Sequence, residues 1–271
     1  MNGEQLVACM EKGERIYGTM MSSTVPTWFS AISTVGLDFV FIDTEHMPLD
    51  RGMLSFLCHN YNALGIAPLV RIPSPDPFEA CKALDAGACG ILAPYIETPE
   101  QVRQLIGAVK YRPLKGNRLQ RVLSGDAVLS KKESDYFKSH NSGRFLLVNI
   151  ESSEAINNLD SILEIPELSG VVIGPHDLSI NLGVPEEYTC KIFTEAVSLI
   201  IRKALEYKKS VGNHFSFGIE QEIGWAKEGM NIILHSIDYI AFMNTMRDEL
   251  NFIRKSLGEP LFAGAAALSA E

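Results

Sequence analysis

The amino-acid sequence predicts an α/β fold, namely a single (β/α)8 barrel of the TIM type. Eight short runs rich in apolar residues alternate with stretches of helical pattern, which is typical of a parallel sheet built from βα units. Several of these runs are apolar almost throughout, as in Phe39–Ile42 and Phe145–Val148, and strands covered on both faces have this composition. The length of 271 residues also fits one such barrel of about 250 residues.

The predicted elements follow one another in regular order along the chain. We predict strands over Ile16–Met21, Asp38–Asp43, Ala67–Ile72, Gly90–Pro94, Phe145–Glu151, Gly170–Gly174, Ser210–Phe215 and Asn231–Ser236. We predict helices over Glu4–Glu11, Pro26–Val35, Asp50–Leu64, Asp76–Ala86, Pro99–Val109, Glu154–Leu163, Cys190–Tyr207, Gly218–Glu228 and Tyr239–Ser256. Ser74–Pro77 and Thr98–Glu100 support two of the helix starts, because each combines a capping side chain with a proline.

The barrel is predicted to span residues 1–257 with one excursion. Residues 111–143 are too many for an ordinary connection between a helix and a strand, and they include a polar run of helical pattern at Ser130–Ser139. Excursions of this size usually cover a site or a partner subunit. Residues 258–271 are rich in Ala and Gly, so we predict a flexible C-terminal tail.

Composition excludes several classes of function. The chain has 24 Lys and Arg against 33 Asp and Glu, a formal charge of −9, and no basic run, which disfavours nucleic acid and membrane surfaces as partners. No apolar run approaches the length of a membrane span and the N-terminal residues lack the pattern of a secretion signal, so we expect a cytoplasmic protein. The five cysteines are scattered without a Cys-x-x-Cys pair, which disfavours a disulfide framework and a structural zinc site.

Polar residues gather where the predicted strands end, and this end of a barrel carries the active site in enzymes of this architecture. These residues are Asp43, Thr44, Glu45 and His46 after the second strand, Arg71 on the third, Asn149 and Glu151 on the fifth, and Gly174, His176 and Asp177 after the sixth. Taken singly, each acidic residue could cap a helix, Arg71 could form a structural ion pair, and His46 could be an ordinary loop histidine. Their convergence favours a functional site.

The residue types indicate metal-assisted chemistry on a small acid. Glu151 and Asp177 offer oxygen ligands that suit Mg²⁺ or Mn²⁺. A metal that chelates a 2-oxo acid would acidify the adjacent carbon. Arg71 could then stabilise the enolate oxygen, and His46 could move the proton directly or through water.

Five segments, in order, resemble the HpcH/HpaI family of metal-dependent (class II) pyruvate aldolases. They are Phe41–His46, Leu69–Pro73, Lys82–Ala88, Ile150–Ala155 and Ile173–Ser179, and the resemblance covers roughly residues 4 to 255. The chain also departs from the family at several positions: Asn149 stands where relatives commonly have Gln, Met20 where they often have an aromatic residue, His176 where a smaller residue is common, and Arg118-Leu119 where an Arg-Gly pair is usual.

The resemblance implies a role for each site residue. Glu151 and Asp177 match the metal ligands, His46 the catalytic base, and Arg71 the arginine that stabilises the enolate. Asp85 matches the acid that pairs with the histidine. Asn149 and the backbone amides around Gly174 and His176 are expected to contact the substrate, the amides receiving the pyruvate carboxylate. The family further implies a barrel of the type that uses pyruvate or phosphoenolpyruvate, a final helix exchanged between subunits, dimers assembled into hexamers, and a site completed by a neighbouring subunit.

These residues lead us to expect an aldolase that reversibly cleaves a 4-hydroxy-2-oxo acid to pyruvate and an aldehyde. A Schiff-base aldolase needs a lysine at a strand end, and none of the eight predicted strand ends has one. An acyl-CoA lyase on the same fold stays open as an alternative, although no basic cluster suits a nucleotide phosphate. A barrel that only binds a ligand is a further alternative, motivated by Met20 and Arg118-Leu119.

Overall fold

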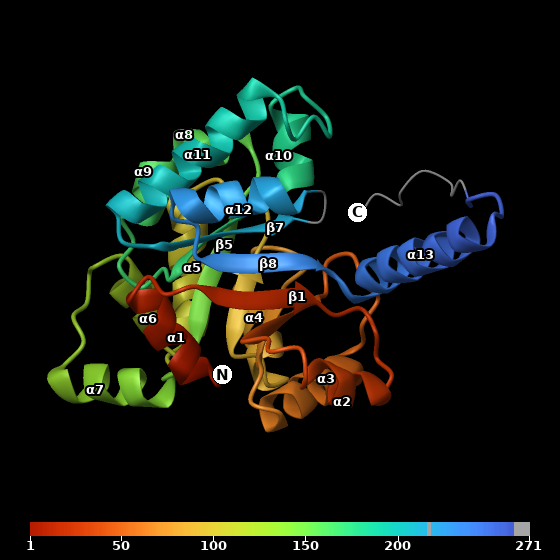
Figure 1. Cartoon of the computed structure of the whole chain (residues 1–271). Helices are drawn as coiled ribbons and strands as arrows, with labels where there is room; N and C mark the ends of the chain where they lie inside the picture. The colour runs from red at the N-terminus through yellow and green to blue at the C-terminus, as the bar shows by residue number, and fades with distance from the viewer. Residues whose placement is uncertain (216–217, 263–271) are drawn as a thin grey trace.

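The computed structural model describes residues 1–215 and 218–262, and its eight strands form a closed barrel (Figure 1). All neighbouring strands are parallel and pair in chain order, and β1 pairs with β8 to close the barrel. The strands are β1 Ile16–Met20, β2 Phe39–Asp43, β3 Ala67–Arg71, β4 Gly90–Ala93, β5 Phe145–Ile150, β6 Gly170–Ile173, β7 Ser210–Phe215 and β8 Ile232–Ile237. The predicted barrel and each of its predicted strands are confirmed.

Helices alternate with the strands and cover the outside of the barrel (Figure 1). They are α1 Gly3–Glu11, α2 Thr27–Ile32, α3 Arg51–Ala63, α4 Pro77–Asp85, α5 Pro99–Lys110, α6 Gly116–Leu123, α7 Lys131–His140, α8 Ser153–Asn157, α9 Leu159–Leu163, α10 Pro175–Asn181, α11 Lys191–Glu206, α12 Ile219–Glu228 and α13 Asp238–Leu257. The two predicted caps are present, because the side chains of Asp76 and Thr98 accept hydrogen bonds from the first turns of α4 and α5.

Three helical segments differ from the prediction. The single helix predicted over Glu154–Leu163 is instead two short helices, α8 and α9, which meet at Asn158. The side-chain amide of Asn158 donates to the backbone carbonyl of Glu97 at 2.8 Å, and this contact anchors the break. Two helices were not predicted: α6 lies in the 111–143 excursion, and α10 begins at Pro175 directly after β6.

Side chains on the strands alternate between two apolar layers. On β2, Phe39 and Phe41 belong to the cluster inside the barrel, whereas Val40 and Ile42 belong to the layer between strands and helices. Glycine at position 18 makes room inside, since a Cβ there would lie 2.4 Å from the ring of Phe39. The interior is thus filled by side chains, and this leaves the ends of the barrel as the places for a ligand.

The last helix, α13, extends away from the barrel (Figure 1). Its first residue, Asp238, is buried and accepts hydrogen bonds from the backbone N–H groups of Ser22 and Ser23 at 3.1 and 2.8 Å. Beyond this anchor the helix carries exposed apolar side chains at helical spacing, namely Phe242, Met246, Leu250, Ile253 and Leu257. The isolated chain therefore leaves an apolar stripe of α13 uncovered.

In the part of the chain that the structure describes, no helix has the length and apolar character needed to cross a membrane. Of the predicted tail, residues 263–271 lie outside the described residues. Residues 258–262 are exposed, and the backbone N–H of Phe262 donates to the side chain of Asn251 at 3.0 Å.

Candidate active site

Strand ends from most of the barrel surround one cavity of about 290 Å³. Its apolar surface comes from residues on β1, β2, β4 and β6, including Met20, Phe41 and Leu92. Six of the residues predicted from the sequence line it: His46, Arg71, Asn149, Gly174, His176 and Asp177. The structure therefore brings these residues together at the end of the barrel where the strands terminate.

Arg71, the last residue of β3, is fixed by two carboxylates from the end of β2. Its Nε and Nη2 donate to the two carboxylate oxygens of Asp43, each at 2.8 Å, and its Nε lies 3.1 Å from Oε2 of Glu45. Burial alone would raise the pKa of Asp43, but the hydrogen bonds and charge of Arg71 outweigh it and lower that pKa. Asp43 is thus an ionised partner of Arg71, and it caps no helix.

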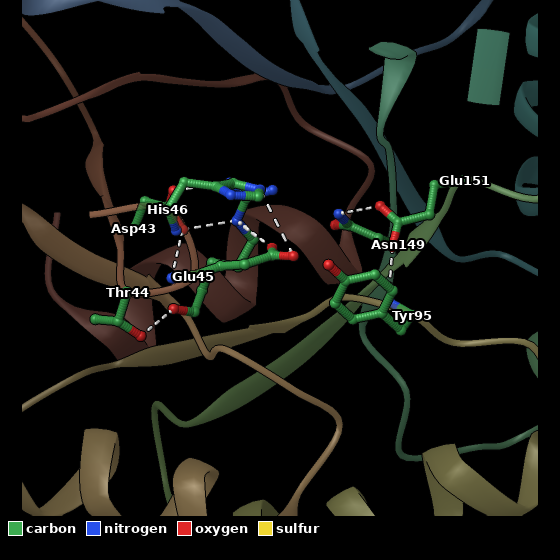
Figure 2. Close-up of polar contacts among 8 residues, drawn as sticks. Asp43, Thr44, Glu45, His46, Tyr95, Asn149 and Glu151 are labelled. Carbon is green, nitrogen blue, oxygen red and sulfur yellow. Dashed lines mark hydrogen bonds and ion pairs between the residues drawn. The ribbon is translucent and has the colours of Figure 1, made fainter. Parts of the chain in front are cut away.

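The loop after β2 places His46 beside this ion pair (Figure 2). Asp43 shapes the loop by accepting hydrogen bonds from the backbone N–H groups of Glu45 and His46, at 3.0 and 3.3 Å. The imidazole Nε2 of His46 lies 3.6 Å from Oε1 of Glu45, and about half of its side chain is exposed. His46 is therefore accessible to a substrate in the cavity.

Glu151 follows β5 and is held from two sides. Its Oε1 accepts a hydrogen bond from the backbone N–H of Tyr95 at 2.7 Å, and its Oε2 accepts one from the side-chain amide of Asn149 at 2.8 Å (Figure 2). The absence of a Cβ at Gly174 gives the carboxylate its space, because an added Cβ would lie 2.7 Å from Oε2. Burial raises the pKa of Glu151, and the nearby charges of Asp177 and Glu45 add to this effect.

The short helix α10 carries the other predicted ligands. Asp177 lies in its first turn and is exposed, and His176 lies beside it with Nδ1 3.6 Å from Oε1 of Glu186. The side-chain amide of Asn181 donates to the backbone carbonyls of both Glu151 and Asp177, at 3.2 and 3.0 Å. Asn181 thereby fixes the start of α10 relative to the end of β5.

Asp85 is the predicted site residue that lies elsewhere. It is the last residue of α4, shortly before β4 begins, so it lies toward the end of the barrel opposite the cavity. Its carboxylate pairs with Arg112, and 58% of its side chain is exposed. Within one chain the two residues lie at opposite ends of the barrel and do not pair, so the pairing of Asp85 with His46 stays a prediction for an assembly.

The 111–143 excursion also lies away from the cavity. The cavity-lining residues come from the strands and from the segments after β2 and β6, and residues 111–143 contribute none of them. The excursion instead forms α6, whose Leu119 and Leu123 contact Gly107 of α5, and α7. Within the chain it covers the outside of the barrel and not this cavity, and its contact with a partner subunit stays a prediction.

Sequence reasoning gave no role to three residues of the site, Glu45, Tyr95 and His214. Glu45 lies inside a quoted motif, and its two contacts with Arg71 and His46 depend on the loop conformation. His214 lines the cavity from β7, and its ring lies edge-on to Phe41 with 5.4 Å between centroids. Burial, with the charge of Arg71, lowers the pKa of His214 to about 4, so its imidazole is neutral at neutral pH. Strand alternation could have placed His214 inside the barrel, but no pattern indicates Tyr95.

The protein is similar to aldolases and related enzymes in its sequence and its structure. Residues 17–245 match the model of the HpcH/HpaI aldolase/citrate lyase family. A 2-keto-3-deoxy-L-rhamnonate aldolase of Salmonella paratyphi B is 37% identical over 182 residues, which cover 65% of this chain and 66% of that protein. The chain thus spans just under two thirds of the length of this relative.

Solved structures of other proteins are similar to this structure over most of its chain. The crystal structure of an HpcH/HpaI aldolase from Desulfitobacterium hafniense DCB-2 has a TM-score of 0.78 at 24% identity, and the match covers 92% of this chain and 96% of that one. A citrate synthase has a TM-score of 0.79 at 25% identity, with 94% of this chain and 99% of the other covered. The extent of the family match and the shared barrel show that the chain belongs to the HpcH/HpaI aldolase/citrate lyase family.

Proposed function

We propose that the protein is a metal-dependent aldolase that cleaves a 4-hydroxy-2-oxo acid to pyruvate and an aldehyde, and that it also runs the reverse reaction. One observation carries the proposal: a fixed carboxylate, Glu151, lies beside a cavity that Asp177, Arg71 and His46 line together. Its similarity to a 2-keto-3-deoxy-L-rhamnonate aldolase supports the reaction class, since a 2-keto-3-deoxy sugar acid is a 2-oxo acid of this kind.

The residues present fit a divalent cation such as Mg²⁺ or Mn²⁺. The charge of Asp177 contributes to the raised pKa of Glu151, which means that the two carboxylates repel each other. A cation bound by both would relieve this repulsion. Within residues 1–215 and 218–262, no group of three or more His, Cys, Asp or Glu side chains suits a metal, so water and substrate would complete the coordination. When bound, the metal would polarise the 2-oxo group of the substrate.

The chain's own residues would do the remaining work. Asp43 occupies Nε and Nη2 of Arg71, so Nη1 is the nitrogen left to bind the 2-oxo oxygen and stabilise the negative charge that develops there. The backbone N–H groups at the start of α10, around Gly174 and His176, would receive the substrate carboxylate, as helix N-termini favour anions. Asn149 lines the same cavity, and its side-chain oxygen is buried without a hydrogen-bond partner among the described residues, so it can accept a bond from the substrate or its water.

His46 would move the proton. In cleavage the 4-hydroxyl group gives its proton to His46, directly or through water, the bond between C3 and C4 breaks, and an aldehyde leaves. The electron pair of the broken bond passes into the pyruvate enolate, and C3 then takes up a proton to give pyruvate. The exposure of His46 at the mouth of the cavity suits this exchange of protons with substrate or water.

We also propose that the protein works as a homo-oligomer in which α13 is exchanged between subunits. The stripe of exposed apolar side chains on α13 supports this, because such a stripe is stabilised by burial against another surface. A groove beside β1 and β8, lined by Tyr17, Trp28 and Ile233, could receive it. In an assembly, Asp85 of one copy could reach His46 of another, which would restore the pairing that one chain does not make.

A pyruvate-release assay on a panel of 4-hydroxy-2-oxo acids, including 2-keto-3-deoxy sugar acids, tests the proposal. We expect activity with Mg²⁺ or Mn²⁺ that a chelator abolishes and that added metal restores. Activity that persists in chelator would indicate a Schiff-base route, and inactivity with every substrate and metal would favour a barrel that only binds a ligand.

A further inference from the structure

We infer that Tyr95 is a positioning residue that connects the predicted metal ligand Glu151 with the group formed by Glu45, His46 and Arg71. The inference rests on the proposed function and adds a residue to its machinery. Tyr95 lies after β4, and Figure 2 shows its ring between Glu45 and Glu151. No residue of the loop after β4 was predicted to belong to the site.

The backbone of Tyr95 has an unusual conformation for its residue type. Its φ is +53°, in the left-handed region that bulky side chains rarely adopt. A residue stays in this region when its surroundings stabilise it, and such residues gather at functional sites. Here the backbone N–H of Tyr95 donates to Oε1 of Glu151 at 2.7 Å. The strained backbone thus fixes one oxygen of Glu151, while Asn149 fixes the other.

The side chain of Tyr95 points away from Glu151 and toward Glu45. Figure 2 shows its phenol oxygen directed toward the carboxylate of Glu45, and interaction with this carboxylate is the main cause that raises the pKa of Tyr95 to about 12. The phenol therefore stays protonated at neutral pH, and it can donate a hydrogen bond to Glu45. About half of the Tyr95 residue is exposed to solvent.

Glu45 also interacts with two groups of the proposed reaction. Its Oε1 lies 3.6 Å from Nε2 of His46, and its Oε2 lies 3.1 Å from Nε of Arg71. Oε2 is buried and has no hydrogen bond of good geometry among the described residues. A hydrogen bond from the phenol of Tyr95 would orient this carboxylate. Loss of the phenol would therefore disturb His46 and Arg71 without removing either.

A double-mutant cycle tests the inference. The variants are Tyr95→Phe, Glu45→Gln and the double variant, and the readout is the rate at which the methyl protons of pyruvate exchange with D₂O in the presence of Mn²⁺. We expect Tyr95→Phe to lower kcat of exchange about 10-fold, with KM for pyruvate unchanged, and to have little further effect when it is added to Glu45→Gln. Mn²⁺ affinity, measured by EPR, should stay at the wild-type value because the backbone N–H of residue 95 is kept.

Two further variants separate the alternatives. Tyr136→Phe, which removes a phenol from the exposed face of α7, is the matched control and should leave exchange unchanged. Tyr95→Gly relieves the strained φ and keeps the N–H, so it should lower exchange as Tyr95→Phe does while Mn²⁺ still binds. An unchanged kcat of exchange in Tyr95→Phe would overturn the inference. The inference would also fail if Tyr95→Phe lowered kcat by the same factor in the wild-type protein and in Glu45→Gln. Absence of exchange in the wild-type protein would instead overturn the proposed function.

Discussion

Two Asp–Arg ion pairs, one at each end of the barrel, have the same chemistry and very different surroundings. At the mouth, Arg71 binds Asp43 through two hydrogen bonds, and their side chains are 14% and 1% exposed. Toward the other end, Arg112 pairs with Asp85, and there the side chains are 23% and 58% exposed. Only the pair at the mouth is enclosed, and only that pair lines the cavity through its arginine.

The comparison indicates that burial, more than residue type, distinguishes the charge that we propose to be functional from a surface charge. A buried pair is screened little by solvent and is already oriented before a substrate arrives, whereas an exposed pair contributes little to stability. The surroundings of Arg71 add two more groups, Glu45 and the aromatic ring of Phe41, whose centroid lies 5.5 Å from the guanidinium carbon. The pair at the mouth is thus part of a network.

The largest effect should come from Arg71→Ala. The variant removes the positive charge that we propose stabilises the enolate oxygen, so exchange of pyruvate methyl protons should fall almost to background, beyond the about 10²- to 10³-fold loss that follows removal of one neutral donor. NMR in D₂O measures this rate. Arg103→Ala removes a half-exposed arginine of α5 that pairs with Glu100, so it is the control and should keep the wild-type exchange rate. Wild-type exchange in Arg71→Ala would refute the role of Arg71.

The next largest effect is expected for His46→Ala. Loss of a general base typically slows proton transfer by about 10²- to 10⁴-fold, and we expect a decrease in this range for cleavage of the 4-hydroxy-2-oxo acid. Pyruvate release with a coupled dehydrogenase measures it. His140→Ala on α7, where the ring stacks on Tyr136, serves as the control, and an equal decrease in both variants would remove His46 from the mechanism.

The two aspartates should differ in their contribution to stability. Asp43→Ala removes two hydrogen bonds from a buried arginine and leaves it only the ion pair with Glu45, so the free energy of unfolding should fall by about 3 kcal/mol, the lower end expected for a broken buried pair. Asp85→Ala removes an exposed partner, and the expected decrease is below about 1 kcal/mol. Urea unfolding followed by circular dichroism compares them. Equal decreases would show that burial does not set the difference between the pairs.

The smallest effect concerns pH. The pKa of Asp43 is lowered from its ordinary value of 3.8, so its contribution to stability is complete above that value and is lost as pH falls through the lower, folded pKa. The pKa of His235, hydrogen-bonded to Glu222, is raised from 6.5, so its contribution is complete below 6.5 and is lost as pH rises through the folded pKa. Urea unfolding measured across the pH range gives the free energy of unfolding as a function of pH. We expect Asp43→Asn to remove only the decrease at acid pH, and His235→Gln to remove only the decrease at alkaline pH.

The barrel could be predicted from sequence because its strands are apolar runs, and burial on both faces imposes that composition. Polar residues at the strand ends could be predicted to lie near one another, because the carboxyl ends of neighbouring parallel strands meet at one end of the barrel. Asp85 could not be placed, because a motif shows that a residue resembles one in relatives but not which end of the barrel it occupies. Tyr95 was missed because its role depends on a backbone conformation, and a sequence pattern does not reveal a positive φ.

The central claim is that Glu151 and Asp177 together bind a divalent cation that presents a 2-oxo acid to Arg71 and His46. A crystal structure with Mn²⁺ and oxamate, an unreactive mimic of pyruvate, tests it most directly. We predict an anomalous peak between the two carboxylates, with oxamate bound to the ion and beside Arg71. A structure in which oxamate occupies the cavity and no manganese lies between Glu151 and Asp177 would contradict the account.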